Sequence, residues 1–270
     1  MTDTQTPAPA AATAAVLVEH VSHVYGSGPE AHHAIEDLNF SIRPQEFVSI
    51  VGPSGAGKTT LLRTLAGLLT PSSGAVWVDG KRLSGVPESM AMVFQDYSRS
   101  LLPWLTIERN VAFPLAGSKH SRAERQEIVE ESLAAVGLAG FGKRYPWQLS
   151  GGMQQRVAIA RALAYRPKLM LMDEPFASVD AQTREGLEDL VLSIRDRYQM
   201  TILFVTHDID ESVYLANRVL VLSKPPAHIV EDLLVELPEP RDQITTREDP
   251  RFVQLRGHVA RLIHGGPAEE

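Results

Sequence analysis

Eight consecutive residues have the composition of a loop that binds phosphate: Gly52, Pro53, Ser54, Gly55, Ala56, Gly57, Lys58 and Thr59. The glycines let backbone N–H groups turn inward around phosphate oxygens, and the helix that follows adds the positive end of its dipole. Lys58 can reach the outer phosphates, and the Thr59 hydroxyl is a ligand for Mg²⁺. An apolar stretch precedes the loop, and a predicted helix begins after it at Thr60. This context favours a nucleoside triphosphate as the ligand, and we expect Thr60 to be one of the nucleotide-binding residues.

Two adjacent carboxylates, Asp173 and Glu174, follow an apolar run at residues 169–172 and precede Pro175. Open α/β sheets bind their ligands at the carboxyl ends of such strands. One carboxylate can hold Mg²⁺ through water, while the other can orient and polarise an attacking water. Taken alone, the pair is better explained as two turn-forming acids before a proline. In a chain that also has a phosphate loop, it predicts a metal and water site.

A second anion site is predicted at residues 149–156, where the sequence is Leu-Ser-Gly-Gly-Met-Gln-Gln-Arg. Ser150, Gly151 and Gly152 precede a run of good helix formers, so a serine hydroxyl and unpaired N–H groups point out of the helix start. An ordinary N-cap with glycine explains these three residues as well, whereas the full string that includes Gln154 is far more specific. The chain therefore has two predicted anion sites and one phosphate loop.

Together, these motifs resemble the ATP-binding subunit of an ABC transporter, and the resemblance runs from about residue 17 to about residue 223. It implies that the ligands are ATP and Mg²⁺. Asp173 then matches a metal ligand, Glu174 matches the catalytic base, and Gln95 matches a glutamine that reaches toward Mg²⁺ and the attacking water. His207 matches a histidine that contacts the γ-phosphate, and Tyr25 matches an aromatic residue that stacks on adenine.

Three of these roles rest on the resemblance. By its own chemistry, His207 is a capping or packed residue after a strand. Gln95 is an ordinary amide after a strand, and Tyr25 is equally a strand-end tyrosine that packs on a sheet. For these residues the sequence leaves both interpretations open.

The resemblance also assigns the second anion site to a partner molecule. In the family, a helix start such as Ser150, Gly151, Gly152 and Gln154 caps the γ-phosphate of ATP bound to a second subunit. The loop that contains Asp180 resembles one that crosses the interface between the two subunits, although Val179 replaces the more usual leucine there. We therefore expect the working ATPase to be a head-to-tail homodimer that holds two nucleotides.

The hydrophobic pattern predicts an α/β fold, a P-loop NTPase cassette of the ABC type. Continuous apolar runs at residues 47–51, 169–172, 201–205 and 218–222 indicate strands covered on both faces, as in a mixed or parallel core sheet. More alternating segments at residues 16–25 and 38–42, with a strand that enters a turn at residues 75–80, predict an antiparallel β subdomain. Residues 101–145 have a helical pattern, with a capping box at Ser121 and Glu124, an apolar face that includes Ile128, Leu133 and Val136, and Gly137 at the end.

The expected domain organisation follows from these elements. It comprises a disordered tail at residues 1–15, an ATPase domain at 16–240 with an α-helical subdomain at about 97–160, and a C-terminal tail at 241–270.

Composition limits the partners of this chain. A formal net charge of −7 with no basic stripe argues against nucleic-acid binding, and the absence of cysteine excludes disulfides and thiolate metal sites. No apolar run of about 18 residues occurs, so nothing in the chain is predicted to span a bilayer. The resemblance then implies integral-membrane permease subunits, an indirect solute-binding protein, and a peripheral location at the cytoplasmic face of the inner membrane.

The segment at residues 94–111, together with residues 176–184, looks most like the nitrate, sulfonate and taurine importer branch. Alternatives are the motor of an importer or exporter for another small solute, or a non-transport ABC ATPase. A repair-type ATPase carries a long coiled coil between the phosphate loop and the second anion site. This sequence has no sustained heptad repeat there, so that class is excluded. Near residues 101–104, Trp104 is either part of the permease contact or part of the core of the helical subdomain.

Overall fold

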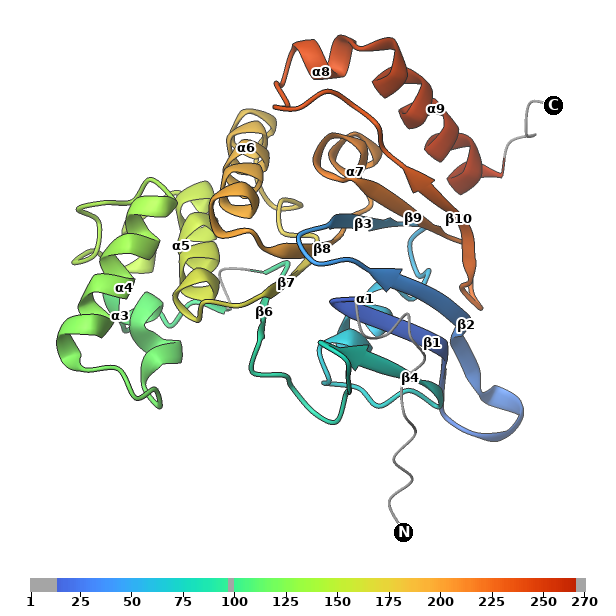
Figure 1. The fold of residues 1–270 in the computed structure, drawn as a ribbon, viewed down its shortest axis with the longest axis horizontal. Helices are drawn as coiled ribbons and strands as arrows, with labels where there is room; N and C mark the ends of the chain where they lie inside the picture. The colour runs from blue at the N-terminus through green and yellow to red at the C-terminus, as the bar shows by residue number, and fades with distance from the viewer. Residues whose placement is uncertain (1–13, 97–99, 266–270) are drawn as a thin grey trace. The chain divides into compact units, whose positions relative to one another are not determined.

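The computed structural model describes residues 14–96 and 100–265 (Figure 1). The chain divides into two compact units. The first unit comprises Met1–Glu88 with Thr201–Glu270, and the second comprises Ser89–Met200. Each unit is described by itself below.

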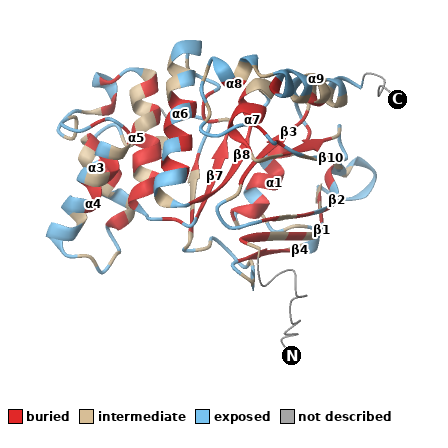
Figure 2. Cartoon of the chain, turned by 45° about the horizontal axis from the view of Figure 1, so that its top comes forward, coloured by how far each residue is buried: buried red, intermediate tan, exposed pale blue. Residues whose placement is uncertain are grey.

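The first unit contains three largely buried strands, β3 (Phe47–Val51), β8 (Thr201–Val205) and β9 (Arg218–Leu222). A fourth strand, β10 (Ile229–Leu234), alternates between half-buried and exposed residues. Their order is β10-β9-β3-β8, with β3 parallel to both β8 and β9, and β10 antiparallel to β9. Every residue of β3 and β8 is buried, and both strands are red in Figure 2. Burial on both faces explains why these segments are continuously apolar, and the predicted strands are confirmed.

Helices α1 (Lys58–Leu65), α7 (Ile209–Leu215), α8 (Thr245–Glu248) and α9 (Pro250–His264) belong to the same unit. Helix α7 packs on β3 and β9, and α9 packs on α7 and β9 (Figure 1). Phe252 and Val259 form the buried side of α9. Residues after 240, which the sequence suggests are a tail, thus include a helix that lies against the core.

The predicted antiparallel subdomain is confirmed as a four-stranded sheet. It consists of β1 (Val16–Tyr25), β2 (His32–Ile42), β4 (Ser73–Val78) and β5 (Lys81–Arg82), in the order β2-β1-β4-β5. Strand β2 begins six residues before the predicted segment at 38–42, because residues 32–37 pair with the end of β1 although their pattern is not cleanly alternating.

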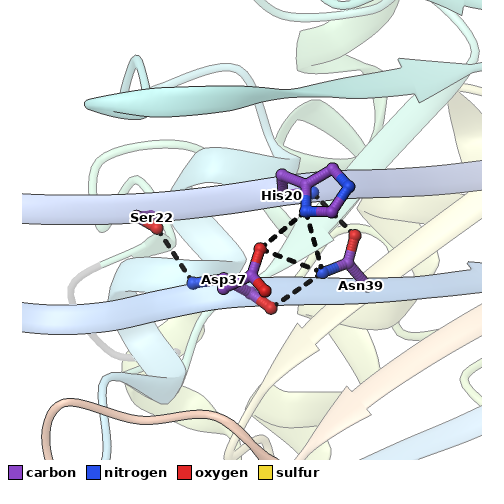
Figure 3. A network of polar contacts seen from close by, with 4 residues as sticks. All are labelled: His20, Ser22, Asp37 and Asn39. Atoms are coloured by element: carbon purple, nitrogen blue, oxygen red, sulfur yellow. Dashed lines mark hydrogen bonds and ion pairs between the residues drawn. The ribbon is translucent and has the colours of Figure 1, made fainter.

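The pairing of β1 with β2 is interrupted by shifts of register. A network of polar contacts joins the two strands at this point (Figure 3). His20 and Asp37 have left-handed backbones, with φ of 50° and 49°. The His20 N–H donates to Asn39 Oδ1 (2.8 Å), the Asp37 N–H donates to Ser22 Oγ (2.9 Å), and His20 Nδ1 lies 2.7 Å from Asp37 Oδ1. Side chains therefore satisfy the backbone groups that the bulge removes from the ladder. The hydrogen bond to His20, followed by that to Asn39, lowers the pKa of Asp37.

The second unit contains a parallel pair of strands, β6 (Met90–Val93) and β7 (Leu169–Asp173). Its helices are α3 (Ile107–Ala112), α4 (Arg122–Ala135), α5 (Gly151–Ala164) and α6 (Ala181–Tyr198). Helix α5 packs against α3, α4, α6 and β6, so it is the central helix of this unit. Short 3₁₀ turns occur at Gly28–Glu30 in the first unit, and at Phe113–Leu115 and Pro146–Gln148 in the second.

Helix α4 begins and ends where the sequence predicts. Ser121 Oγ accepts from the Glu124 N–H (3.2 Å), and Glu124 Oε2 accepts from the Ser121 N–H (2.6 Å), which completes the capping box. Ile128 and Leu133 are buried on one side of the helix. Gly137, with φ of +73°, takes the left-handed conformation that stops the helix.

The strand irregularity predicts a strict requirement for glycine at position 74. Gly74 has φ of +82°, and a Cβ there would lie 2.2 Å from the backbone oxygen of His20. We expect Gly74→Ala to lower the free energy of unfolding by ~2–5 kcal/mol, through left-handed strain and overpacking against the backbone. Gly85→Ala is the matched control, because Gly85 has φ of +90° and a Cβ there would meet no atom within 4 Å. It should lose only about 1–2 kcal/mol. Equal losses in urea unfolding would contradict the close approach at Gly74.

Candidate functional site

The predicted phosphate loop connects β3 to α1 and packs tightly against β2. Gly55 and Gly57 have left-handed backbones, with φ of +79° and +74°. A Cβ at Gly57 would lie 2.8 Å from Ile35 Cγ2 and 2.9 Å from the Ala34 carbonyl oxygen. Glycine is therefore required here both for the backbone conformation and for contact with β2.

Lys58 is the first residue of α1, and its side chain folds into the loop. Only 7% of the residue is exposed. Its Nζ donates to the carbonyl oxygens of Gly52 (2.8 Å) and Pro53 (3.1 Å). A buried ammonium requires polar partners and favours a nearby anion. Ser54, Gly55 and Thr59 are exposed around it, so the loop has the features of a phosphate cradle: accessible backbone, a buried cation and an accessible hydroxyl.

His207 lies at the same edge of the sheet as the loop. In the parallel pairing of β3 and β8, Ile50 is opposite Val205, and the Thr206 N–H donates to the Ile50 carbonyl oxygen (3.1 Å). The loop begins two residues after Ile50, and exposed His207 follows two residues after Val205. The N-cap of α7 is Asp208, whose Oδ1 accepts from the Glu211 N–H (3.2 Å). The capping role considered for His207 therefore belongs to its neighbour.

Tyr25 ends β1 close to the helix that follows the loop. Its hydroxyl lies 3.1 Å from Thr60 Oγ1 on α1. The residue is 39% exposed, so part of the ring surface is open to solvent while the hydroxyl is held. The first unit thus gathers three of the predicted elements of the site: the loop with Lys58, Tyr25 beside Thr60, and His207.

In the second unit, parallel pairing brings Gln95 and Glu174 together. Val93 on β6 is opposite Met172 on β7, and each side chain follows two residues later. Gln95 Nε2 donates to Glu174 Oε2 at 3.4 Å. Asp173 is the buried last residue of β7. This arrangement brings an amide and a carboxylate together beside a second carboxylate.

Glu174 has a left-handed backbone with φ of 42°. Such a conformation costs a residue with a Cβ about 1–2 kcal/mol, and strained residues of this kind concentrate at functional sites. The Ala177 N–H donates to the Glu174 carbonyl oxygen (3.2 Å), so Glu174 opens a tight turn that includes Pro175. Among the described residues, no group of three or more histidine, cysteine, aspartate or glutamate side chains could hold a metal ion. Mg²⁺ does not require one, because it commonly uses one or two carboxylates with substrate phosphates and water.

The second predicted anion site is the start of α5, as expected. Ser150 is the N-cap, and its Oγ accepts from the Met153 N–H at 3.4 Å. Gly151 and Gly152 are the first two residues of the helix. Gln154 Nε2 donates to the Leu149 carbonyl oxygen (3.2 Å), which braces the loop before the helix.

Asp180 is the N-cap of α6, and the starts of α5 and α6 touch through a residue that the sequence analysis does not single out. Asp180 accepts from the Thr183 N–H (3.0 Å) and from the Thr183 hydroxyl (2.7 Å). These two bonds, with the backbone bond first, lower the pKa of Asp180. A Cβ at Gly152 would lie 2.2 Å from Thr183 Cγ2. The spacing of Asp180 and Thr183 is a helix N-cap signal, but their contact with Gly152 is tertiary.

Arg156 has a positioning role that its place in the 149–156 string does not indicate. Its guanidinium donates to the carbonyl oxygens of Val136 (3.0 Å) and Gly186 (3.3 Å). Arg156 therefore ties α5 both to the end of α4 and to α6.

The residues around Trp104 differ in their exposure to solvent. Leu101 is 2% exposed, whereas Trp104 is 70% exposed, so the interpretation of Trp104 as a core residue is wrong. Buried Asn110 holds this segment, because its side chain bonds to Leu102 and donates to the carbonyl oxygens of Leu105 and Thr106. Within the described part of the chain, we find no helix with the length and apolar character needed to cross a bilayer.

Comparison with known proteins gives a consistent result. Residues 35–177 match the family model described as ABC transporter. A nitrate import ATP-binding protein of Synechocystis sp. is 44% identical over 242 residues, covering 88% of this chain and 90% of that protein. A bicarbonate transport ATP-binding protein of the same organism is 39% identical over 264 residues, covering 97% and 93%.

One solved structure similar to this chain is described as a dimeric post-hydrolysis state of an ATP-binding cassette bound to ADP and phosphate. It is 33% identical, has a TM-score of 0.71, and covers 82% of this chain and 98% of that one.

The contact between the two helix starts predicts a specific rescue. Gly152→Ala should lower the free energy of unfolding by about 1–3 kcal/mol, because the new methyl collides with a threonine that Asp180 holds in place. Adding Thr183→Ser removes the colliding Cγ2 but keeps the hydroxyl bond, so most of the stability should return. Gly186→Ala in α6 is the control, since a Cβ there makes only a 3.5 Å contact with Arg156. The free energies of unfolding are measured by chemical denaturation. A Gly152→Ala variant as stable as the Gly186→Ala control would contradict the contact.

Proposed function

The chain belongs to the ABC transporter family, and from this premise we propose that it is the ATP-hydrolysing subunit of an importer for a small anion such as nitrate, sulfonate or taurine. The observation that carries the ATPase role is the buried Lys58 ammonium inside a glycine loop at the end of a parallel strand. The relatives named for nitrate and bicarbonate support a small anion as the cargo.

Nucleotide binding is proposed for the residues at the loop. Between Gly52 and Thr60, the backbone N–H groups of the residues other than Pro53 would bind phosphate oxygens, with Lys58 neutralising their charge. Tyr25 would stack on the base, since its ring is partly open and its hydroxyl is held by Thr60. Thr59, Gln95 and Asp173 are proposed as the residues that hold Mg²⁺, all of which offer the oxygen ligands that this ion prefers. When bound, Mg²⁺ would offset the negative charge of the phosphates.

Glu174 is the proposed general base for the attacking water. Its carboxylate accepts a hydrogen bond from Gln95, so the amide can orient the carboxylate and also contact the water. His207, exposed at the same sheet edge as the loop, is proposed to contact the γ-phosphate. Each of these groups acts by holding a proton or charge at a fixed atom, which is the main contribution of a protein to phosphoryl transfer.

The second anion site is proposed to act on a second copy of the chain. Ser150, Gly151, Gly152 and Gln154 would cap the nucleotide of the other subunit, with Asp180 at the interface. One chain has a single phosphate loop and a separate helix start of this type, which supports shared sites in a homodimer. The dimeric state described for the similar solved cassette also supports it.

Trp104 is proposed as part of the contact with a permease, because it is exposed and tryptophan is enriched at protein interfaces relative to the rest of the surface. A solute-binding protein would act through the permease, and the subunit would work at the cytoplasmic face of the inner membrane. We further propose that the ATPase domain spans residues 16–240, and that α9, which packs on α7 and β9, is a C-terminal addition to it. The motor of a transporter for another small solute, or a non-transport ABC ATPase, is the alternative function.

Two substitutions should separate binding from hydrolysis. Lys58→Ala should weaken ATP binding roughly 10- to 200-fold, the effect of losing a charged hydrogen bond. Lys81→Ala, which removes an exposed lysine of β5, is the control and should bind normally. Glu174→Gln should bind ATP but hydrolyse it about 10²- to 10⁴-fold more slowly, the usual contribution of a general base. Fluorescent-nucleotide titration and phosphate release measure the two effects.

Hydrolysis by Glu174→Gln at the wild-type rate would remove Glu174 as the base. The import role has its own readout in cells of the source organism. Cells that carry only the Lys58→Ala chain should lose uptake of one labelled anion among nitrate, sulfonate and taurine. Normal uptake of all three would favour the alternative function.

A further inference from the structure

A buried histidine contacts the tyrosine that is proposed to stack on the base. His23 precedes Tyr25 by two residues on β1, and alternate residues of a strand point to the same face. His23 is 7% exposed. Its Nδ1 is buried and has no hydrogen-bond partner among the residues that the structure describes.

Core packing by itself does not explain a histidine at this position. Whichever tautomer is present, burial of the unpaired Nδ1 leaves a desolvation penalty uncompensated. A phenylalanine of similar shape would avoid that penalty. His20, three residues earlier, shows the contrast, because its ring is exposed and Nδ1 lies beside Asp37 (Figure 3).

Among the residues that the structure describes, the ring of His23 contacts one other aromatic ring, that of Tyr25. The two ring centroids are 4.5 Å apart and the ring planes are inclined at 76°, an edge-to-face arrangement. This geometry is favourable because the positive edge of one ring meets the negative face of the other. The Tyr25 hydroxyl is held separately, 3.1 Å from Thr60 Oγ1. Tyr25 is thus fixed at two points, by its hydroxyl from α1 and by its ring from β1.

We propose that His23 is a positioning residue for nucleotide binding, which holds the ring of Tyr25 in the orientation that stacks on the base. His23 acts through Tyr25 and contributes to the binding of nucleotides that carry a base, but not to the binding of phosphate. This inference rests on the proposed function of Tyr25 in ATP binding. It adds a residue that no motif in the sequence indicates.

A double-mutant cycle with two ligands tests the proposal. The variants are His23→Ala, Tyr25→Ala and the pair, and the ligands are ATP and inorganic tripolyphosphate, each with Mg²⁺, measured by calorimetry. His23→Ala should weaken ATP binding about 2- to 10-fold, the range of an aromatic pair contact. Tyr25→Ala should weaken it by roughly 5- to 150-fold, the range of base stacking. The double variant should bind ATP no more weakly than Tyr25→Ala, and tripolyphosphate affinity should not change.

Three further variants keep the result interpretable. His20→Ala removes an exposed imidazole from the same strand and should leave the ratio of ATP to tripolyphosphate affinity unchanged. His23→Phe keeps an aromatic ring at this position and should retain ATP affinity within about 2-fold. If His23→Ala does not fold, His23→Leu fills the space without a ring and should show the same selective loss of ATP affinity.

Equal weakening of ATP and tripolyphosphate by His23→Ala or His23→Leu would indicate a general structural role and overturn the proposal. A further loss of ATP affinity on adding His23→Ala to Tyr25→Ala would overturn it as well, since His23 would then act independently. If the folded wild-type chain bound tripolyphosphate but ATP no more tightly, the role of Tyr25 would fail together with the inference. If it bound neither ligand, the proposed function itself would fail.

Discussion

Parallel hydrogen bonding between largely buried strands is the constraint on which the candidate site depends. In the first unit, the pairing of β3 with β8 brings the end of one strand, with its phosphate loop, beside the end of the other, with His207. In the second unit, the pairing of β6 with β7 does the same for Gln95 and Glu174. A shift of either pair by one residue would move every side chain of a strand to its opposite face, where the closely packed neighbours do not fit it. The hydrophobic core therefore fixes the register, and the register fixes which polar residues meet.

Capped helix starts also position residues of the candidate site. Ser150, Asp180 and Asp208 each cap a helix by accepting from a backbone N–H three residues later. At α5 and α6 the caps are coupled, because Gly152 leaves just enough room for the Thr183 methyl, and Asp180 holds Thr183. Polar groups that cap helices thus also define the shape of the predicted second anion site.

Local patterns account for what could be predicted. The apolar runs mark β3, β7, β8 and β9 because burial on both faces leaves no room for polar alternation, and the Ser121 and Glu124 pair marks the start of α4 because capping is a contact within one turn. The missed features depend on packing. The contact between Gly152 and Thr183 joins two helices that no local periodicity relates. The bonds of Asn110 to residues 102–106 and the ring contact of His23 with Tyr25 are local in the chain, but they depend on burial and side-chain orientation that the residue types do not indicate. Trp104 shows the same limit, since a tryptophan in a helical region is compatible with either core or surface until its exposure is known.

We propose that the two anion sites of one chain serve two nucleotides that are shared between two copies of the chain. The most direct measurement mixes a chain carrying Lys58→Ala with one carrying Ser150→Arg, both also carrying Glu174→Gln to prevent hydrolysis, and follows ATP-dependent dimerisation by size-exclusion chromatography. Each mutant alone lacks a complete site, whereas the mixture can form one intact site from the loop of one chain and the α5 start of the other. We predict a dimer with ATP in the mixture and monomers in each pure protein. Correctly folded mutants that form no dimer when mixed would contradict action between copies and leave Ser150 as a helix cap within its own chain.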